Sequence, residues 1–198
     1  MTPADISEAI VAIQQGRVII YPTDTLYGLG ADIFNHNAVR TVFAIKHRPL
    51  DMPLSVAVSS VDDISTIACI PEYAQSLLTT FLPGSLTIIL PKRGHIPESI
   101  TGKETTIAIR VPNHPLAQHL LSSYGPLTAT SANIHGQHTP STIMGLKKQF
   151  GDAIAQYVDG GTLRGQPSTI VDLTTTQPKI LREGTISTQA ILEVISDE

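Results

Sequence analysis

Short runs of apolar, mostly β-branched residues constrain the fold of this chain more than any other feature. They cover residues 17–21, 86–90 and 106–111, and each is followed closely by proline. A continuous apolar run of this length is typical of a strand buried on both faces, because a strand with one wet face alternates apolar and polar residues. Between these runs, apolar residues recur every three or four positions, which indicates amphipathic helices. The pattern favours a sheet covered by helices.

We predict helices and strands from these two periodicities. Helices are expected over residues 2–15, 37–46, 61–67, 72–81, 115–124, 141–150 and 187–195. Thr2 is expected to cap the first of these helices. Strands are expected over residues 17–21, 53–58, 86–90, 106–111, 127–130, 156–158, 169–173 and 179–181, and residues 22–30 are expected to form a turn. Helices and strands alternate at first and strands cluster later, which predicts an α/β or α+β fold with a mixed sheet flanked by helices. No repeat or linker is apparent, so we expect a single domain over residues 1–198.

Composition excludes several classes of protein. The chain has 198 residues, enough for a core without disulfides. It carries 13 basic and 17 acidic residues, a net charge of −4, which disfavours a general electrostatic grip on nucleic acid. A single cysteine, Cys69, fits a reducing compartment. With no signal peptide and no long apolar stretch visible, we expect a cytoplasmic protein without a membrane span.

Motifs that mark common nucleotide and metal sites are absent from the sequence. There is no GxxxxGK[ST], GxGxxG, CxxC, HExxH or GxSxG pattern. The histidine pairs His114 with His119 and His135 with His138 have no obvious third ligand. We therefore expect no metal site built from protein ligands.

Polar residues gather instead where the predicted strands end. The segment PTDTLYGLG (22–30) follows the first strand, and TATSAN (128–133) and PSTIVD (167–172) flank later ones. Loops at strand ends are where α/β proteins place ligands, and their hydroxyls and backbone groups are available for binding. Each segment alone is equally compatible with ordinary turn chemistry.

Cationic residues accompany these segments. Lys46 and Arg48 stand one residue apart, where they could complement the end of a helix or clamp a phosphate. Arg110 ends an apolar run, so its charge requires either an internal carboxylate or a ligand. Arg182 follows another predicted strand and could pair with Glu183. Together, these cations and hydroxyls favour an anionic nucleotide, whose transfer needs positioning and charge neutralisation rather than a protein nucleophile.

Seven ordered segments resemble the YrdC-like family over almost the whole chain: PTDTLYGLG, KHRP followed by PLSV, PGSLTIIL, TTIAIRVPNHPLA, TATSAN, PSTIVD and ILREG. The resemblance implies a twisted α/β sheet with a concave, positively lined cavity. It implies threonylcarbamoyl-AMP synthase activity, which converts L-threonine, bicarbonate and ATP, with Mg²⁺, into L-threonylcarbamoyladenylate and pyrophosphate. A partner transferase would use this product to form threonylcarbamoyladenosine at position 37 of tRNA, so any contact with tRNA is expected to be indirect or weak.

The resemblance also implies roles for individual residues. The catalytic residues would be Lys46 and Arg48, at the ATP phosphates. L-threonine would contact Thr25, Arg110, Ser131 and Ser168. ATP would contact Arg48, Thr106, Asn133, Ser141 and Arg182.

Two positions depart from the family pattern. Met52 stands where the family often has asparagine near ATP, and Ala57 stands where it often has histidine. A branch of the same family, the YciO-like proteins, departs from the SAN motif. The alternative to the synthase is a non-catalytic RNA-binding protein of the same fold. This chain keeps Ser131, Asn133 and the Lys46-x-Arg48 pair, which favours the synthase.

Overall fold

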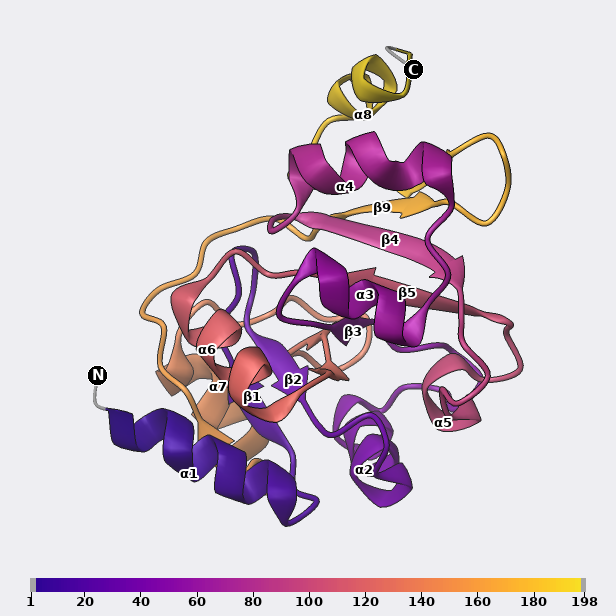
Figure 1. Ribbon diagram of the computed structural model, residues 1–198. Helices are drawn as coiled ribbons and strands as arrows, with labels where there is room; N and C mark the ends of the chain where they lie inside the picture. Colours follow the sequence, from indigo (N-terminus) through magenta and orange to yellow (C-terminus); the bar gives the residue numbers. More distant parts are fainter. Residues whose placement is uncertain (1–2, 197–198) are drawn as a thin grey trace.

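Two sheets form the centre of the molecule (Figure 1). The structure is a computed structural model that describes residues 3–196. The smaller sheet has the strand order β7-β2-β1-β8, with β1 (Ile19–Tyr21), β2 (Gly28–Gly30), β7 (Thr130–Ser131) and β8 (Gln156–Tyr157). The larger sheet has the order β10-β9-β4-β5-β3-β6, with β3 (Val56–Ala57), β4 (Leu86–Pro91), β5 (Thr106–Arg110), β6 (Leu127–Thr128), β9 (Thr169–Asp172) and β10 (Lys179–Arg182). The predicted α/β architecture is confirmed.

The sequence predicted one mixed sheet; the structure has two, and both mix parallel and antiparallel pairs. In the larger sheet β4 runs parallel to β9 and antiparallel to β5, while β3 runs parallel to β5. In the smaller sheet β1 is antiparallel to β2 and parallel to β8. Parallel neighbours need long crossover connections, and helices supply several of them.

Eight α-helices and two short 3-10 turns surround the sheets within the described residues. The helices are α1 (Pro3–Gln14), α2 (His36–Lys46), α3 (Val61–Ile67), α4 (Gln75–Phe81), α5 (Glu98–Thr101), α6 (Pro115–Tyr124), α7 (Ile143–Phe150) and α8 (Thr188–Ser196), and the turns are η1 (Glu72–Ala74) and η2 (Gly151–Ala153). Local signals explain where they begin. Asn35 caps α2 by accepting from two backbone N–H groups, and Pro115 occupies the first turn of α6. None of these helices is long and apolar enough to cross a membrane.

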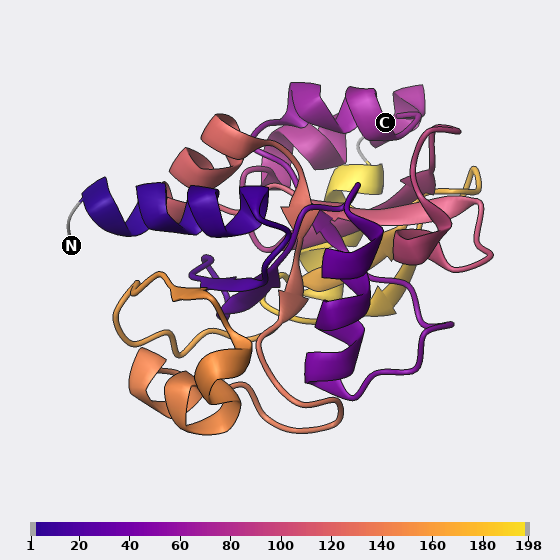
Figure 2. The same cartoon turned by 90° about the horizontal axis from the view of Figure 1, so that it is seen from below.

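The helices divide the core into two apolar clusters. Seen from below, the smaller sheet lies between α1 on one side and α7 on the other (Figure 2). Ile13 of α1 and Leu120 of α6 belong to the cluster on one side of this sheet. The larger cluster joins α7 to the larger sheet, and includes Ile88 of β4 and Leu78 of α4. Burial of these side chains supplies the main driving force for folding.

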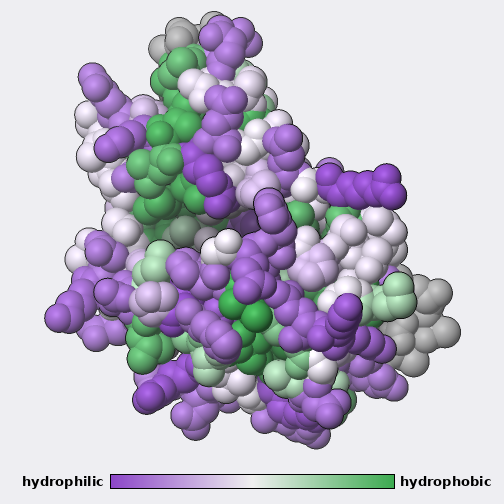
Figure 3. Space-filling view, turned by 180° about the vertical axis from the view of Figure 1, so that it is seen from behind, coloured by the Kyte–Doolittle hydropathy of each residue, from purple (hydrophilic) through white to green (hydrophobic). Residues whose placement is uncertain are grey.

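Only one face of the larger sheet is fully covered by helices. α3 crosses in front of its strands and α8 packs against α4 (Figure 1). On the opposite face, Ile89, Ala108 and Ile170 are only partly buried, although each sits in the middle of the sheet. Seen from behind, the molecule has an apolar strip in its upper part and mostly hydrophilic side chains below it (Figure 3). The partly covered face leaves room for a ligand.

The structure corrects several predicted elements. Residues 28–30, expected within a turn, form β2, because Gly28 and Gly30 let the strand lie flat on the ring of Tyr21; a Cβ on Gly30 would come within 3.0 Å of that ring. The predicted strands over 53–58 and 127–130 shorten to β3 and to the separate strands β6 and β7. The predicted helix over 72–81 splits into η1 and α4, and α5 was not expected. The capping role predicted for Thr2 lies outside the described residues.

Candidate functional site

A cavity of about 230 Å³ opens on the partly covered face of the larger sheet. Its walls come from the turn between β1 and β2, the loop after α2, the start of β4, the end of β5, β7, the start of β9 and the end of β10. Thr87 lies beside Ile170 in the β4–β9 register, and Ile170 lies beside Arg182 of β10. The expected concave cavity is therefore present, at the edge where several strands end.

Hydroxyl groups and guanidinium groups dominate the cavity. Seven threonine and serine residues line it: Thr23, Thr25, Ser55, Thr87, Thr130, Ser131 and Ser168. Three arginines line it as well, Arg48, Arg110 and Arg182, while its lining includes no aspartate or glutamate. Such a site is electropositive and rich in hydrogen-bond partners, which suits an anionic ligand.

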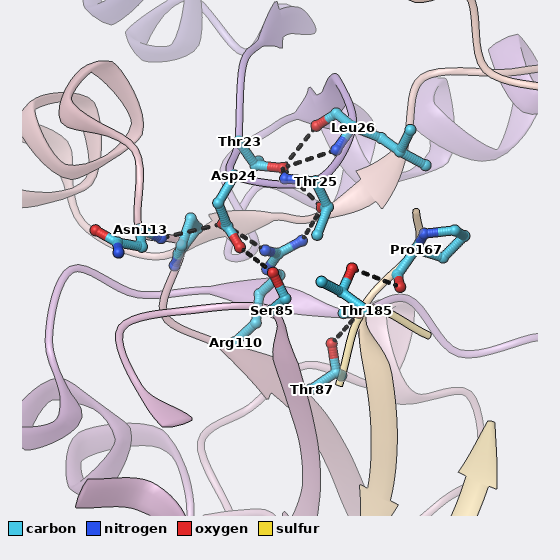
Figure 4. A network of polar contacts seen from close by, with 12 residues as sticks. Thr23, Asp24, Thr25, Leu26, Ser85, Thr87, Arg110, Asn113, Pro167 and Thr185 are labelled. Atoms are coloured by element: carbon cyan, nitrogen blue, oxygen red, sulfur yellow. Dashed lines mark hydrogen bonds and ion pairs between the residues drawn. The ribbon is translucent and has the colours of Figure 1, made fainter. Parts of the chain in front are cut away.

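Arg110 is the most buried of these arginines. Its guanidinium donates through Nη2 to Oδ1 of Asp24 at 2.7 Å and through Nη1 to the hydroxyl of Thr25 at 2.8 Å (Figure 4). Arg110 is 6% exposed, and its buried Nε has no hydrogen-bond partner. The sequence left an internal carboxylate and a ligand as alternatives for this charge. The structure supplies the carboxylate and still leaves donors of the guanidinium free.

Asp24 was not among the predicted site residues. Its carboxylate accepts from Arg110, from the backbone N–H of Asn113 at 3.0 Å and from the hydroxyl of Ser85 at 2.7 Å. The signal that could have identified it was already in the sequence, since Asp24 immediately precedes Thr25 and a buried arginine needs a countercharge.

Ser168 and Arg182 meet on another wall of the cavity. The hydroxyls of Ser168 and Thr87 are 2.7 Å apart, and both residues are buried. Arg182 donates through Nε and Nη2 to the backbone oxygen of Ser168, at 3.1 and 2.8 Å. Arg182 is exposed as a whole residue, but partial desolvation of its guanidinium, and then the positive charge of Arg110, lowers its pKa. The surface pair with Glu183 considered from the sequence is not formed; Arg182 belongs to the cavity.

Arg48 reaches the cavity from the loop after α2. Its guanidinium donates to the backbone oxygen of Pro53 at 2.8 Å and, at 3.4 Å, to that of Met52. Burial lowers the pKa of Arg48. Met52 contributes this carbonyl but its side chain is 37% exposed and does not line the cavity. Ala57 is fully buried in the apolar cluster with α1 and α6, so it makes no contribution to the cavity.

Lys46 is not part of the cavity lining. Its ammonium donates to the backbone oxygens of Ser131 and Asn133, at 2.5 and 3.0 Å. Lys46 is 2% exposed, and burial together with the positive charge of Arg48 lowers its pKa to about 8. The Asn133 side chain closes the same loop by donating to the backbone oxygens of Ile134 and Gln137. In this structure Lys46 and Asn133 shape the loop that presents Ser131.

Two further predicted contacts lie apart from the cavity lining. Thr106 begins β5, four residues before Arg110, and pairs with Pro91 at the far end of β4. Ser141 is held by its backbone oxygen, which accepts from the N–H of Leu163 at 2.9 Å. The structure thus brings together Thr25, Arg48, Arg110, Ser131, Ser168 and Arg182, and it leaves Lys46, Thr106, Asn133 and Ser141 around them. Their contacts with ligands stay predictions.

A segment from Asp159 to Pro167 crosses between the two sheets beside the Thr25 turn. The Tyr27 hydroxyl donates to the backbone oxygen of Gly161 at 2.7 Å and accepts from the N–H of Gly160 at 2.9 Å. Further along, a Cβ on Gly165 would lie 2.3 Å from the backbone oxygen of Thr25. Glycine at position 165 lets this segment hold the turn in place.

We expect Gly165→Ala to displace the Thr25 turn. The added methyl group meets backbone, which cannot give way as a side chain can, so the free energy of unfolding should fall by about 1–3 kcal/mol. Ligand binding in the cavity should weaken as well. Denaturant unfolding measures the first effect. Gly94→Ala, whose Cβ would meet nothing within 4 Å, is the matched control; equal stability of the two variants would contradict the close contact.

The residues present do not form a cage for a metal ion. No group of three or more His, Cys, Asp or Glu residues within the described part of the chain is placed to hold one. The cavity lining offers hydroxyl oxygens but no carboxylate. Mg²⁺ brought in on a nucleotide is typically held by phosphate oxygens and water, so it would not need such a cage.

Known proteins resemble this chain in sequence over most of its length. The family model Sua5_yciO_yrdC, described as "Telomere recombination", matches residues 11–184. The chain is 38% identical over 192 residues to a putative threonylcarbamoyl-AMP synthase of Mycobacterium tuberculosis, covering 96% of this chain and 88% of that protein. It is 39% identical over 188 residues to the threonylcarbamoyl-AMP synthase of Pyrococcus abyssi, covering 93% of this chain but only 55% of that protein. The chain thus spans about half the length of this longer relative.

Solved structures show the same relationship. The structure of P. abyssi Sua5 complexed with L-threonine superposes with a TM-score of 0.91 at 40% identity, over 96% of this chain and 57% of that one. Escherichia coli YciO superposes with a TM-score of 0.87 at 31% identity, over 93% of this chain and 91% of that one. Sequence and fold agree over nearly the whole chain, which therefore belongs to the Sua5/YciO/YrdC family.

Proposed function

We propose that this protein is a threonylcarbamoyl-AMP synthase, a nucleotidyltransferase that makes L-threonylcarbamoyladenylate and pyrophosphate from L-threonine, bicarbonate and ATP. Relatives with this name cover most of the chain at 37–39% identity. The observation that carries the proposal is the cavity itself. It places an oriented arginine, Arg110, beside the Thr25 hydroxyl, with two more arginines in the same lining.

Each part of the cavity suits one part of the substrates. Arg110 would hold the amino-acid carboxylate through the donors that Asp24 and Thr25 leave free. Thr25 and Ser168, which line the same cavity, would bind the threonine hydroxyl. A structure of P. abyssi Sua5 with L-threonine bound supports threonine as the amino acid.

The arginines would supply the electrostatic part of the reaction. The amine of threonine adds to CO₂ derived from bicarbonate and loses a proton, and an oxygen of the resulting carbamate attacks the α-phosphorus of ATP. The bond from the α-phosphorus to the bridging oxygen breaks, and pyrophosphate leaves with that oxygen. Arg48 and Arg182, both in the lining, would neutralise charge on the phosphates, with Lys46 supporting the loop beside them. Mg²⁺ on the phosphates would lower the charge of the leaving group.

The wider role follows from this product. A threonylcarbamoyl-adenylate is a mixed anhydride that a partner transferase can deliver to tRNA, so we propose a cytoplasmic role in tRNA modification with little direct tRNA contact. The net charge of −4 is consistent with weak binding of RNA. The relatives named as synthases favour this role over a non-catalytic RNA-binding protein.

The experiment that tests the proposal is pyrophosphate release from ATP. Release should require both L-threonine and bicarbonate, and omission of either should reduce it to background. Arg110→Ala, which removes the carboxylate contact, serves as the inactive control. Release that ignores threonine or bicarbonate, or RNA binding without any release, would refute the synthase function.

We expect the cavity to select amino acids in the order threonine, serine, valine. Serine lacks only the methyl group, so its transition-state binding should weaken by about 1–3 kcal/mol, whereas valine has no hydroxyl to hydrogen-bond with Thr25 and Ser168 and should lose more. Steady-state pyrophosphate release with each amino acid, at saturating ATP and bicarbonate, gives the order as kcat/KM. Valine used as well as threonine would show that the cavity does not bind the hydroxyl.

A further inference from the structure

Asp24 and Arg110 form the only ion pair between side chains in the described part of the chain. Their atoms are 2.7 Å apart, and the side chains are 13% and 7% exposed. An ion pair held this far from solvent is costly to form and is weak evidence for a purely stabilising role. Its position suggests another role, because one partner lines the cavity and the other does not.

The carboxylate of Asp24 is fixed from three directions. Ser85, just before β4, donates to Oδ2, while Oδ1 accepts from the Asn113 backbone just beyond β5 and from Arg110 (Figure 4). Asp24 therefore ties the Thr25 turn to the ends of two neighbouring strands. It cannot turn into the cavity without breaking these contacts.

The orientation of Arg110 follows from this anchoring. Asp24 takes one N–H of Nη2, and Thr25 takes one N–H of Nη1. A guanidinium has five N–H donors in a rigid plane, so two fixed contacts define the direction of the remaining three. One of these, on Nε, is buried and has no partner. The Arg110 guanidinium is therefore oriented to bind a carboxylate before the ligand arrives.

We propose that Asp24 is a positioning residue that orients the Arg110 guanidinium for bidentate recognition of the amino-acid carboxylate. The inference rests on the proposed function, since it assigns how that substrate is recognised. Asp24 also offsets the charge of Arg110, so the site recognises a carboxylate by geometry as well as by charge. Asp24 acts through Arg110 and does not touch the substrate.

The test compares L-threonine with L-threoninamide, which keeps the amine and the hydroxyl but lacks the carboxylate. Calorimetric titration of the wild-type protein should show tighter binding of threonine, by roughly 10-fold or more. In Asp24→Ala this preference should collapse to nearly the value found in Arg110→Ala. Asp24→Asn should retain most of the preference, because its amide oxygen still accepts from Arg110 and Asn113. Ser85→Ala, which removes one supporting hydrogen bond, is the matched control and should lose much less.

A merely structural role for Asp24 gives a different result. In that case Asp24→Ala would weaken both ligands equally and leave their ratio unchanged, which would overturn the inference. The double variant Asp24→Ala/Arg110→Ala should show the same ratio as Arg110→Ala alone; a further fall would also contradict it. Failure of the proposed function is distinguishable, because a wild-type protein that binds neither ligand and releases no pyrophosphate would fail before any variant is compared.

Discussion

Replacing Arg110 with lysine should reduce kcat/KM for threonine by roughly 10- to 150-fold, the equivalent of about 1.5–3 kcal/mol for a charge-assisted hydrogen bond. Lysine keeps the positive charge and can still pair with Asp24, but it has a single nitrogen in place of a planar fork. It cannot contact Asp24, Thr25 and a substrate carboxylate in the geometry that the guanidinium provides.

Steady-state pyrophosphate release with varied threonine measures this effect, and the loss should appear mainly in the KM for threonine if the contact is made equally in the ground and transition states. Arg40→Lys, at an exposed position of α2, makes the same chemical change outside the cavity and should leave activity unchanged. A fully active Arg110→Lys enzyme would show that charge alone suffices and that no carboxylate fork exists.

Replacing Lys46 with methionine should lower the free energy of unfolding by about 2–6 kcal/mol, since two backbone oxygens lose a charged donor at a cost of ~1–3 kcal/mol each. The side chain is nearly the same size, so the loss reports the ammonium group rather than a cavity. Ser131 sits on the loop that this ammonium holds, so activity should fall as well. Denaturant unfolding of Lys46→Met beside Lys148→Met, an exposed lysine of α7, gives the comparison. Equal stability of the two variants would show that the loop does not need the ammonium.

The stability difference between wild type and Lys46→Met should also depend on pH. Burial lowers the pKa of Lys46 in the folded protein to about 8, whereas in the unfolded chain it is about 10.4. Between these values the unfolded state binds more protons, so the wild type gains stability relative to the variant as the pH rises from about 8 to about 10. Unfolding at pH 7 and pH 9.5 measures the change. If the stability difference between wild type and variant shrinks as the pH rises, the carbonyl oxygens of Ser131 and Asn133 raise the pKa of Lys46 more than burial lowers it.

Elements with strong periodicity were predictable from sequence, and those defined by tertiary contacts were not. The helices α3 and α6 have the predicted bounds, because their apolar residues recur at helical spacing. The strands β4 and β5 differ from prediction by one residue, because their apolar runs are continuous. β2 was missed because its two glycines carry no strand signal, and only the ring of Tyr21 explains them. The bounds of the two-residue strands were also predicted poorly, because such strands are defined by pairing with a neighbouring strand and not by their own sequence.

Some of the cavity residues could be predicted from the sequence, and others could not. Charged residues next to the end of a predicted strand, such as Arg110 and Arg182, could be identified because a charge there needs a partner. Asp24 and Thr87 were missed, since a carboxylate in a turn and a threonine in a strand have many ordinary explanations. The sequence also could not show that the Lys46 ammonium binds two loop carbonyls and stays out of the cavity lining, because the direction of a side chain at the end of a helix depends on the loop packed against it.

The cavity takes its walls from residues as far apart in the chain as Thr23 and Arg182. No short fragment of the chain contains the whole site, so binding competence and the folded state arise together. A substrate that occupies the cavity therefore acts on the entire domain by mass action, and a ligand at 100 times its dissociation constant should add about 2.7 kcal/mol to the free energy of unfolding. The melting temperature of the protein then becomes a direct assay of which small molecules the cavity accepts, even for those that cannot react.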